Sequence, residues 1–179
     1  MELSLKRKGD YAVRAMISVA RQYGTGLRQA RQIATEMHFP YKTLTLILAG
    51  LVAEGLLVAV HGPTGGYRLA RDPGDISLLD IVQAAEGTLT LDRCVLRDGP
   101  CDWGETCPVH DTWARAQDAL TRELASISLA EIAVIDAAIE DGSHQPETPA
   151  HTHATERHGM RNRAGQQVTG ETPANLAGP

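Results

Sequence analysis

The sequence predicts a mainly α-helical fold: a winged helix-turn-helix domain, then a long C-terminal helix and a disordered tail. Three observations predict it. Three stretches with helical spacing of apolar residues follow one another in the first 55 positions, a Gly- and Pro-rich turn between two apolar runs comes next, and basic residues concentrate in the same part of the chain. Helix, helix and hairpin in this order are the elements of a winged helix.

The first two helices are identified by their apolar faces and by the residues that end them. The first is expected over residues 11–22, before Gly24 and Gly26, and its apolar face holds Val13, Met16, Ile17 and Ala20. The second is short, stops at the sequence His38-Phe39-Pro40, and has an apolar face of Ala30, Ile33, Ala34 and Met37.

The third helix and the hairpin complete the predicted winged helix. The helix ends near Gly55 and has apolar residues at helical spacing, namely Leu44, Ile47, Leu48, Leu51 and Val52. The stretch LLVAVHGPTGGYRLAR that follows is typical of a strand, a tight turn and a second strand. The alternative is a small three-helix bundle with an ordinary edge hairpin.

Charge is distributed unevenly along the chain and indicates a partner for the first half. The net charge is −5, but residues 1–71 carry ten Lys/Arg against four Asp/Glu, a net of +6. Residues 72–140 carry four against fourteen, a net of −10. A local basic surface is what binding to a polyanion such as double-stranded DNA requires. The alternative is two solvated faces of opposite sign.

If the first half binds DNA, the third helix is expected to lie in the major groove. With its core face turned inward, the positions available for base contact are Tyr41, Lys42, Thr43, Thr45 and Leu46. Near the tip of the hairpin, His61 and Thr64 are expected to contact the DNA backbone or the minor groove.

The second half is predicted to be helical and to end in a tail. A helix begins after Ser77 with a capping-box pattern, a long one follows Pro108, and a last one ends near Glu140. The long helix has an apolar stripe of Trp113, Ala116, Leu120 and Leu124. It is expected to form a homodimer, although a plain core helix has the same pattern. We divide the chain into a DNA-binding domain (1–90), a cysteine loop with dimerisation helices (91–140) and a disordered tail (141–179).

All three cysteines lie in one loop with a histidine after the last: Cys94, Cys101, Cys107 and His110, in the pattern C-x6-C-x5-C-x2-H. Neither a secretory signal nor a membrane-spanning run is visible, so we expect a cytoplasmic protein with no membrane partner. Clustered thiols in that reducing compartment favour metal binding over disulfides. The donor set suits an iron–sulfur cluster or a Cys3His zinc site, and an unliganded loop is the third possibility.

The motifs KGDYAVRAM, VHGPTGGYRLARDPGDISLLDIVQAAEG, CPVHDTW and SLAEI resemble the Rrf-two (Rrf2) family of bacterial winged-helix repressors, over roughly residues 1–140. Within it they are similar to the iron–sulfur-cluster regulators (IscR-like) and the nitric-oxide-sensing repressors (NsrR-like). The resemblance implies a homodimer on a palindromic promoter site, with a cluster on Cys94, Cys101 and Cys107 whose state changes DNA affinity. It thus implies an iron–sulfur-dependent transcriptional regulator, a repressor, that senses redox, nitric oxide or iron and cluster status.

The resemblance leaves two candidates for the fourth ligand. His110 stands where the cluster regulators place a histidine and favours a 2Fe–2S cluster, our preferred cofactor. Asp10 stands where the nitric-oxide sensors supply an aspartate from the partner subunit and favours 4Fe–4S. No enzyme motif and no small-molecule substrate are indicated. The alternative functions are a zinc-stabilised DNA-binding protein without a sensing role and a cluster carrier.

Overall fold

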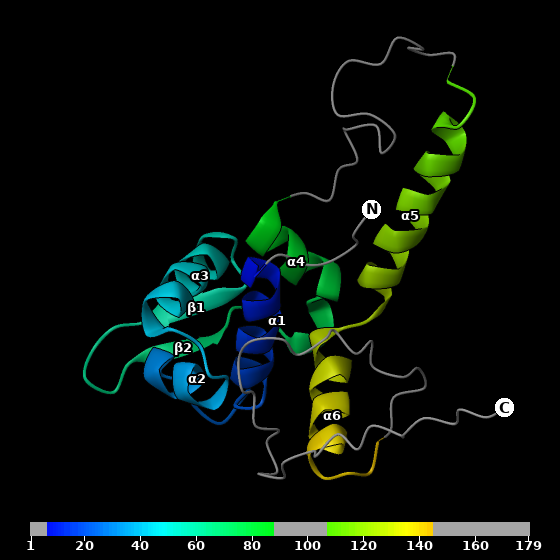
Figure 1. Ribbon diagram of the computed structural model, residues 1–179. Helices are drawn as coiled ribbons and strands as arrows, with labels where there is room; N and C mark the ends of the chain where they lie inside the picture. The colour runs from blue at the N-terminus through cyan, green and yellow to red at the C-terminus, as the bar shows by residue number, and fades with distance from the viewer. Residues whose placement is uncertain (1–6, 88–106, 145–179) are drawn as a thin grey trace, which may run out of the picture. The chain divides into compact units, whose positions relative to one another are not determined.

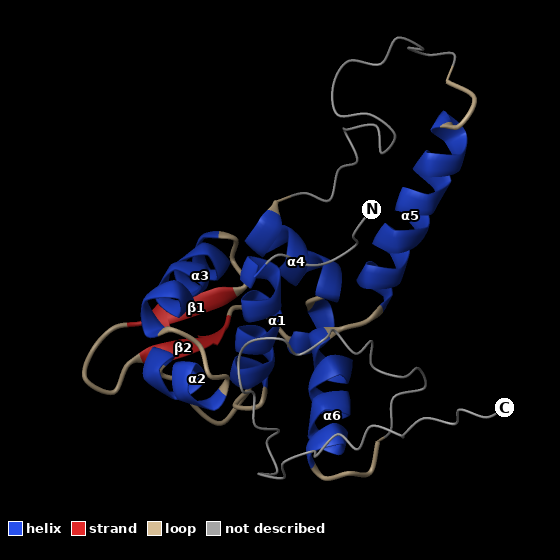
Figure 2. Cartoon of the chain, in the orientation of Figure 1, coloured by secondary structure: helices blue, strands red, loops and turns tan. Residues whose placement is uncertain are grey.

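The computed structural model describes residues 7–87 and 107–144 (Figure 1). In chain order the elements are α1 (Arg7–Ala20), α2 (Ala30–Glu36), α3 (Tyr41–Ala53), β1 (Leu57–Val60), β2 (Gly66–Leu69), a 3-10 turn η1 (Pro73–Asp75), α4 (Leu78–Glu86), α5 (His110–Ser126) and α6 (Leu129–Glu140). This part of the chain is mostly helical with one two-stranded sheet, as predicted (Figure 2). The tail predicted to be disordered is residues 141–179, and from residue 145 on it lies outside the described ranges.

The core lies where α1 meets α2, α3, α4 and β2. Its largest fully buried side chains include Met16, Ile33, Leu44, Leu48 and Ile81, which come from four different helices. Burying one such side chain stabilises the fold by about 1.5–3 kcal/mol. The helix-turn-helix and the hairpin are therefore joined to α1 and α4 by one hydrophobic cluster.

The predicted apolar face of α1 is rotated in the structure. Met16 is buried as expected, but Val13 and Ile17 are only partly buried and flank the core. The inward face instead holds Ala12, Ala15, Met16, Ser18 and Val19. Alanine leaves room for neighbouring helices to approach closely, and Ser18 is hydrogen-bonded, so hydrophobicity alone does not identify this face. The helix also begins at Arg7 instead of residue 11.

The helix-turn-helix forms as predicted. Ile33 and Ala34 of α2 are buried, and the chain turns at His38, which has a φ of 57°. Pro40 precedes the first turn of α3, where its missing N–H costs no hydrogen bond. The predicted inner face of α3 is buried at Leu44, Ile47, Leu48 and Leu51, and Val52 packs against it.

The wing is an antiparallel hairpin in which Leu57 pairs with Leu69 and Val60 with Gly66. Arg28, just before α2, forms a further bridge to β2: its N–H donates to the Tyr67 carbonyl at 2.9 Å, and the Tyr67 N–H donates back at 2.8 Å. This contact explains Gly66, and the tight turn of the hairpin explains Gly65. A Cβ at Gly66 would lie 2.7 Å from the Arg28 carbonyl oxygen, and one at Gly65 would lie 2.2 Å from the Val60 carbonyl oxygen.

Of the helices that follow the wing, α4 and α6 begin at capping boxes, the first as the sequence predicts, whereas α5 has no side-chain cap. The Ser77 hydroxyl accepts a hydrogen bond from the Asp80 N–H at 3.1 Å, and the Ser77 N–H donates to the Asp80 carboxylate. Ser128 and Glu131 repeat this pattern at the start of α6. The segment between α5 and α6 is tied to the start of α4, because the Leu129 N–H donates to the Ile76 carbonyl at 2.7 Å.

No residue of α5 is buried in this chain. Trp113 and Leu124 of its predicted apolar stripe are partly buried, whereas Ala116 and Leu120 are exposed. The helix is therefore not a core helix of the part of the chain that the structure describes.

Candidate DNA interface and cysteine site

The predicted base-reading residues share the face of α3 that points away from the core. Four are exposed, with Leu46 at 76% and Tyr41 at 48%, and Thr45 is partly buried. The Thr45 hydroxyl donates to the Lys42 carbonyl at 2.9 Å and keeps its oxygen available as an acceptor. The face thus offers a cation, two hydroxyls, a phenol and an apolar side chain. Contact of these residues with DNA stays a prediction.

The two residues predicted at the wing tip lie between the strands. His61 and Thr64 are exposed in the connection from Val60 to Gly66. Gly62 in this connection has a φ of 123°, a conformation that side chains other than glycine rarely adopt. The turn therefore displays both polar side chains at the end of the hairpin.

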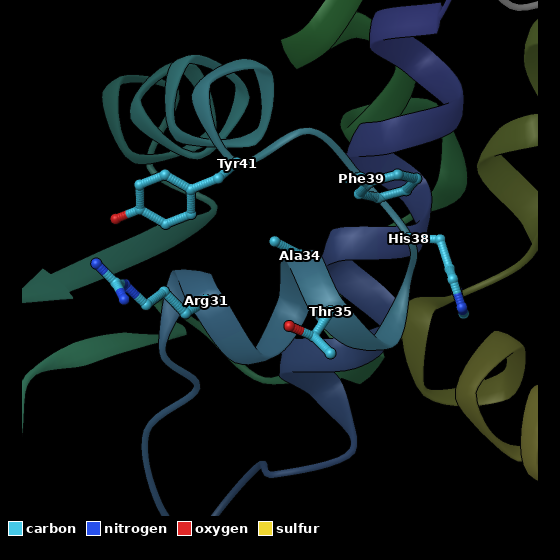
Figure 3. A pocket seen from close by; sticks show the side chains of 6 residues that line it. All are labelled: Arg31, Ala34, Thr35, His38, Phe39 and Tyr41. Atoms are coloured by element: carbon cyan, nitrogen blue, oxygen red, sulfur yellow. The ribbon is translucent and has the colours of Figure 1, made fainter.

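Sequence reasoning missed Arg31, which lies beside the recognition helix. Its guanidinium carbon is 5.8 Å from the centre of the Tyr41 ring, which is a cation–π contact. In Figure 3 the Arg31 side chain extends from α2 toward Tyr41, while His38 points away from both. The hollow between α2 and the start of α3 measures about 600 Å³, and its lining is Arg31, Ala34, Thr35, His38, Phe39 and Tyr41. The position of Arg31 on the polar face of α2, opposite Ile33, was the available signal.

Several of the N-terminal arginines are paired with carboxylates within the chain. Arg14 contacts Asp10 at 2.9 Å, and Arg71 contacts Asp80 at 3.2 Å. Arg21 pairs with Glu36 and Asp136, and Arg28 pairs with Glu36. Within the described ranges, the N-terminal cations without a carboxylate partner are Arg7, Lys8, Arg31, Lys42 and Arg68. The basic surface available to DNA is thus smaller than the net charge of +6 indicates.

The cysteine site is described only at its C-terminal end, since Cys94 and Cys101 lie outside the described residues. Cys107 is a partly buried free thiol, and its carbonyl accepts a hydrogen bond from the His110 N–H at 3.2 Å. His110 is the first residue of α5 and is exposed. A thiolate and an imidazole at adjoining positions fit the soft and borderline ligands that iron–sulfur clusters and zinc use.

The alternative ligand, Asp10, lies on α1 and contacts Arg14. The Gly9 N–H donates to the Glu86 carboxylate at 3.1 Å, so the start of α1 lies beside the end of α4, just before residues 88–106. Among residues 7–87 and 107–144, no three His, Cys, Asp or Glu side chains form a group able to hold a metal ion. The structure therefore does not choose between His110 and Asp10.

Comparison with known proteins identifies the family to which this fold belongs. Residues 5–134 match the family model named Rrf2, described as an iron-dependent transcriptional regulator. The chain belongs to the Rrf2 family. It is 32% identical to the HTH-type transcriptional regulator IscR of Xenorhabdus nematophila, over 82% of this chain and 92% of the relative. The IscR of Enterobacter sp. is also 32% identical, over 80% and 90%.

Solved structures of Rrf2 regulators support the fold. The structure of T. potens IscR is 31% identical, with a TM-score of 0.61, and the match covers 82% of this chain and 96% of that one. CymR, the global cysteine regulator of B. subtilis, is 26% identical, with a TM-score of 0.62 and coverage of 74% and 98%.

Membership of the Rrf2 family confirms several predictions. The resemblance and the winged-helix fold class were right, and the chain is a transcriptional regulator, not an enzyme. Regulation of transcription implies DNA as a partner. In the described ranges no helix is long and apolar enough to cross a membrane.

Proposed function

We propose that this Rrf2 protein is a cytoplasmic, iron–sulfur-cluster-dependent repressor. Two copies bind a palindromic promoter site through α3 and the wing, and the state of a cluster on Cys94, Cys101 and Cys107 changes DNA affinity. His110 is the fourth ligand of a 2Fe–2S cluster, with Asp10 of the partner subunit as the alternative in a 4Fe–4S one. The observation that supports this best is the mostly exposed outer face of α3 in a chain whose three cysteines lie within the 16 residues before α5.

The exposed side chains of α3 have the chemistry that base reading needs. Lys42 can donate to guanine or to phosphate, and the hydroxyls of Thr43 and Thr45 can donate or accept. Leu46, with three quarters of its surface exposed, can contact a thymine methyl group. Arg31 joins this set as a phosphate-binding cation beside Tyr41.

The lack of buried residues in α5 supports the proposal that two copies pair through this helix. One recognition helix covers too few base pairs for specific binding, so a symmetric dimer on two half-sites is expected. α5 has 17 residues and none of them is buried within the chain, although Trp113, Leu120 and Leu124 lie along one apolar stripe. A second copy would cover this stripe and remove it from water.

The cysteine segment is placed so that a cluster can act on the dimer. When bound, the cluster would be the sensing centre, because it changes its redox state, reacts with nitric oxide or is lost. The Cys107 carbonyl accepts a hydrogen bond from the N–H of His110, the first residue of α5. A change in the conformation of the cysteine segment would therefore affect the start of that helix. A nitrogen or oxygen ligand is exchanged more readily than a thiolate, which makes the fourth position the sensitive one.

Visible spectra, iron content and DNA binding of anaerobically purified variants test the proposal. Cys94→Ala, Cys101→Ala and Cys107→Ala are each expected to abolish the cluster. His110→Ala is expected to leave a more labile one, and Asp10→Ala to change little. Asp118→Ala, which removes an exposed carboxylate farther along α5, is the control. The reverse result for His110 and Asp10 would assign the fourth ligand to Asp10.

Three outcomes would reject the proposal or part of it. Full iron occupancy after loss of any single cysteine contradicts the site. Equal DNA affinity of the holo and apo forms contradicts sensing, and binding no tighter to any promoter fragment than to random DNA contradicts regulation. Colourless protein that contains zinc favours the zinc-stabilised alternative, and a coloured protein that transfers its cluster without binding DNA favours a carrier.

A further inference from the structure

A group of charged side chains lies on the side of α1 that faces α2. Ser18 of α1 is completely buried, and its hydroxyl donates to the Glu36 carboxylate at 2.8 Å. The Arg28 guanidinium pairs with the same carboxylate oxygen, and its Nε lies 3.4 Å from the Ser18 hydroxyl. Glu36, the last residue of α2, is thus held by α1 and by the segment that precedes α2.

Arg21 extends this group to α6. One of its terminal nitrogens lies 2.9 Å from the second oxygen of Glu36, and its Nε donates to Asp136 of α6 at 2.9 Å. The side chains of Arg21, Glu36 and Asp136 are 21%, 22% and 19% exposed, so water screens these pairs only in part. Two cations and two anions are matched. We call Ser18, Arg21, Arg28, Glu36 and Asp136 the clasp.

The clasp connects the elements that the proposed function assigns to DNA. Arg28 contributes its side chain to Glu36 of α2 and its backbone to Tyr67 of the wing. Arg28 therefore fixes the wing relative to α2. At the other end, Asp136 connects Arg21 to α6, a helix in which only Leu129 is buried.

We propose that the clasp positions α2 and the wing for DNA binding, and that Asp136 is the positioning residue by which α6 holds them. The proposal rests on the proposed function, because it assumes that α3 and the wing meet DNA. A seven-residue helix and a two-stranded hairpin are too short to be stable alone, so their orientation depends on tertiary contacts. Arg21 and Arg28 accordingly act within the fold and not on phosphate.

Loss of positioning and loss of a negative charge are expected to change DNA affinity in opposite directions, so the experiment can separate them. Removal of a negative charge from a DNA-binding protein weakens its repulsion from phosphate and raises affinity. Loss of positioning lowers affinity instead. Asp136→Asn is therefore expected to weaken DNA binding by about fivefold, a coupling effect of ordinary size. Asp118→Asn, the same change at an exposed position of α5, is expected to leave affinity unchanged or slightly higher.

The measurement is fluorescence anisotropy with the full-length protein and two duplexes of equal length. One carries the promoter fragment that the wild type binds most tightly, and the other has random sequence. Asp136→Glu, which keeps the carboxylate, is expected to restore most of the affinity. Equal affinity of Asp136→Asn and Asp118→Asn would overturn the proposal. Absence of any preference by the wild type would instead overturn the proposed function.

Amide hydrogen exchange tests the clasp without DNA. In Asp136→Asn, exchange is expected to become faster in residues 29–36 and 57–69, and to stay slow in the core of α3 at residues 44–51. An ion pair that only stabilises α6 would speed exchange in residues 129–140 alone. That result would refute positioning, whatever the protein does with DNA.

Discussion

Lys42→Gln is expected to weaken the salt dependence of DNA binding, whereas Arg71→Gln is not. Lys42 is exposed in the first turn of α3 and has no carboxylate partner in the part of the chain that is described. Arg71 follows the wing but lies 3.2 Å from the Asp80 carboxylate. Both substitutions remove one positive charge from residues 1–71, so net charge alone predicts the same effect for both.

The magnitude follows from the number of unpaired cations. Five cations of residues 7–71 lack a carboxylate partner among the residues described, which makes ten in a dimer. If all ten neutralised phosphates, the slope of log Kd against log salt would be about 9, since each contact contributes about 0.9. Lys42→Gln removes two contacts from the dimer and is expected to lower the slope by about 1.8. Arg71→Gln is expected to change it by less than about 0.5.

Anisotropy titrations at four or more salt concentrations between about 50 and 200 mM would give both slopes. The random-sequence duplex is the better probe here, because phosphate contacts dominate non-specific binding. An equal fall of the slope in the two variants would show that ion pairing within the chain does not withhold Arg71 from DNA. No fall in either would show that α3 does not meet the backbone at Lys42.

Three further predictions concern stability and local geometry. Gly66→Ala is expected to lower the free energy of unfolding in urea by about 1–3 kcal/mol, because its Cβ would meet the Arg28 carbonyl. Gly50→Ala has open space around its Cβ and should raise the free energy of unfolding by up to about 1 kcal/mol; the opposite order would refute the account of the wing. Leu44→Ala is expected to lower the free energy of unfolding by about 2–5 kcal/mol, and Leu46→Ala by less than about 0.5 kcal/mol. Of the two, only Leu46→Ala should reduce the DNA affinity of the folded protein. Equal losses of stability would show that the inner face of α3 is wrongly assigned. Hydrogen bonds from the Ser128 hydroxyl and amide hold the pKa of Glu131 below its usual value, so Ser128→Ala should raise that pKa in an NMR titration. Because the folded-state pKa of Glu131 is the lower one, its stabilising contribution is present above the usual glutamate pKa and is lost as pH falls through the folded-state value.

Local signals predicted α2, α3 and the wing, because the structure of each is decided within a few residues of sequence. Pro40 and Gly55 mark the limits of α3, and its apolar spacing identifies the buried face. For α1 the same reasoning misplaced the inner face. Hydrophobic size favoured Val13 and Ile17, whereas close approach to neighbouring helices favoured the alanines.

The candidate site was predictable where the chain itself brings residues together. The outward position of the five residues on α3, four of them exposed and Thr45 partly buried, follows from helical spacing once the core face is known. The contact of Arg31 with Tyr41 depends on the angle between α2 and α3, which no spacing rule gives. The pairing of Arg21 with Asp136 spans 115 positions and needs the complete fold.

Burial and ion pairing decide which cations of residues 1–71 are available to a polyanion, and the charge distribution of the sequence does not show this. A count of charges does not distinguish the arginines of residues 1–71 from one another. In the fold, Arg21 and Arg28 form ion pairs with partly buried carboxylates, whereas Arg31 and Arg68 have no carboxylate partner in the described ranges. Loss of a paired cation leaves a desolvated carboxylate without its partner, so the cost falls on stability and geometry. Loss of an unpaired cation costs the fold little and falls on salt-dependent affinity. The same change from arginine to glutamine therefore has two different phenotypes, decided by whether a carboxylate lies within ion-pair distance.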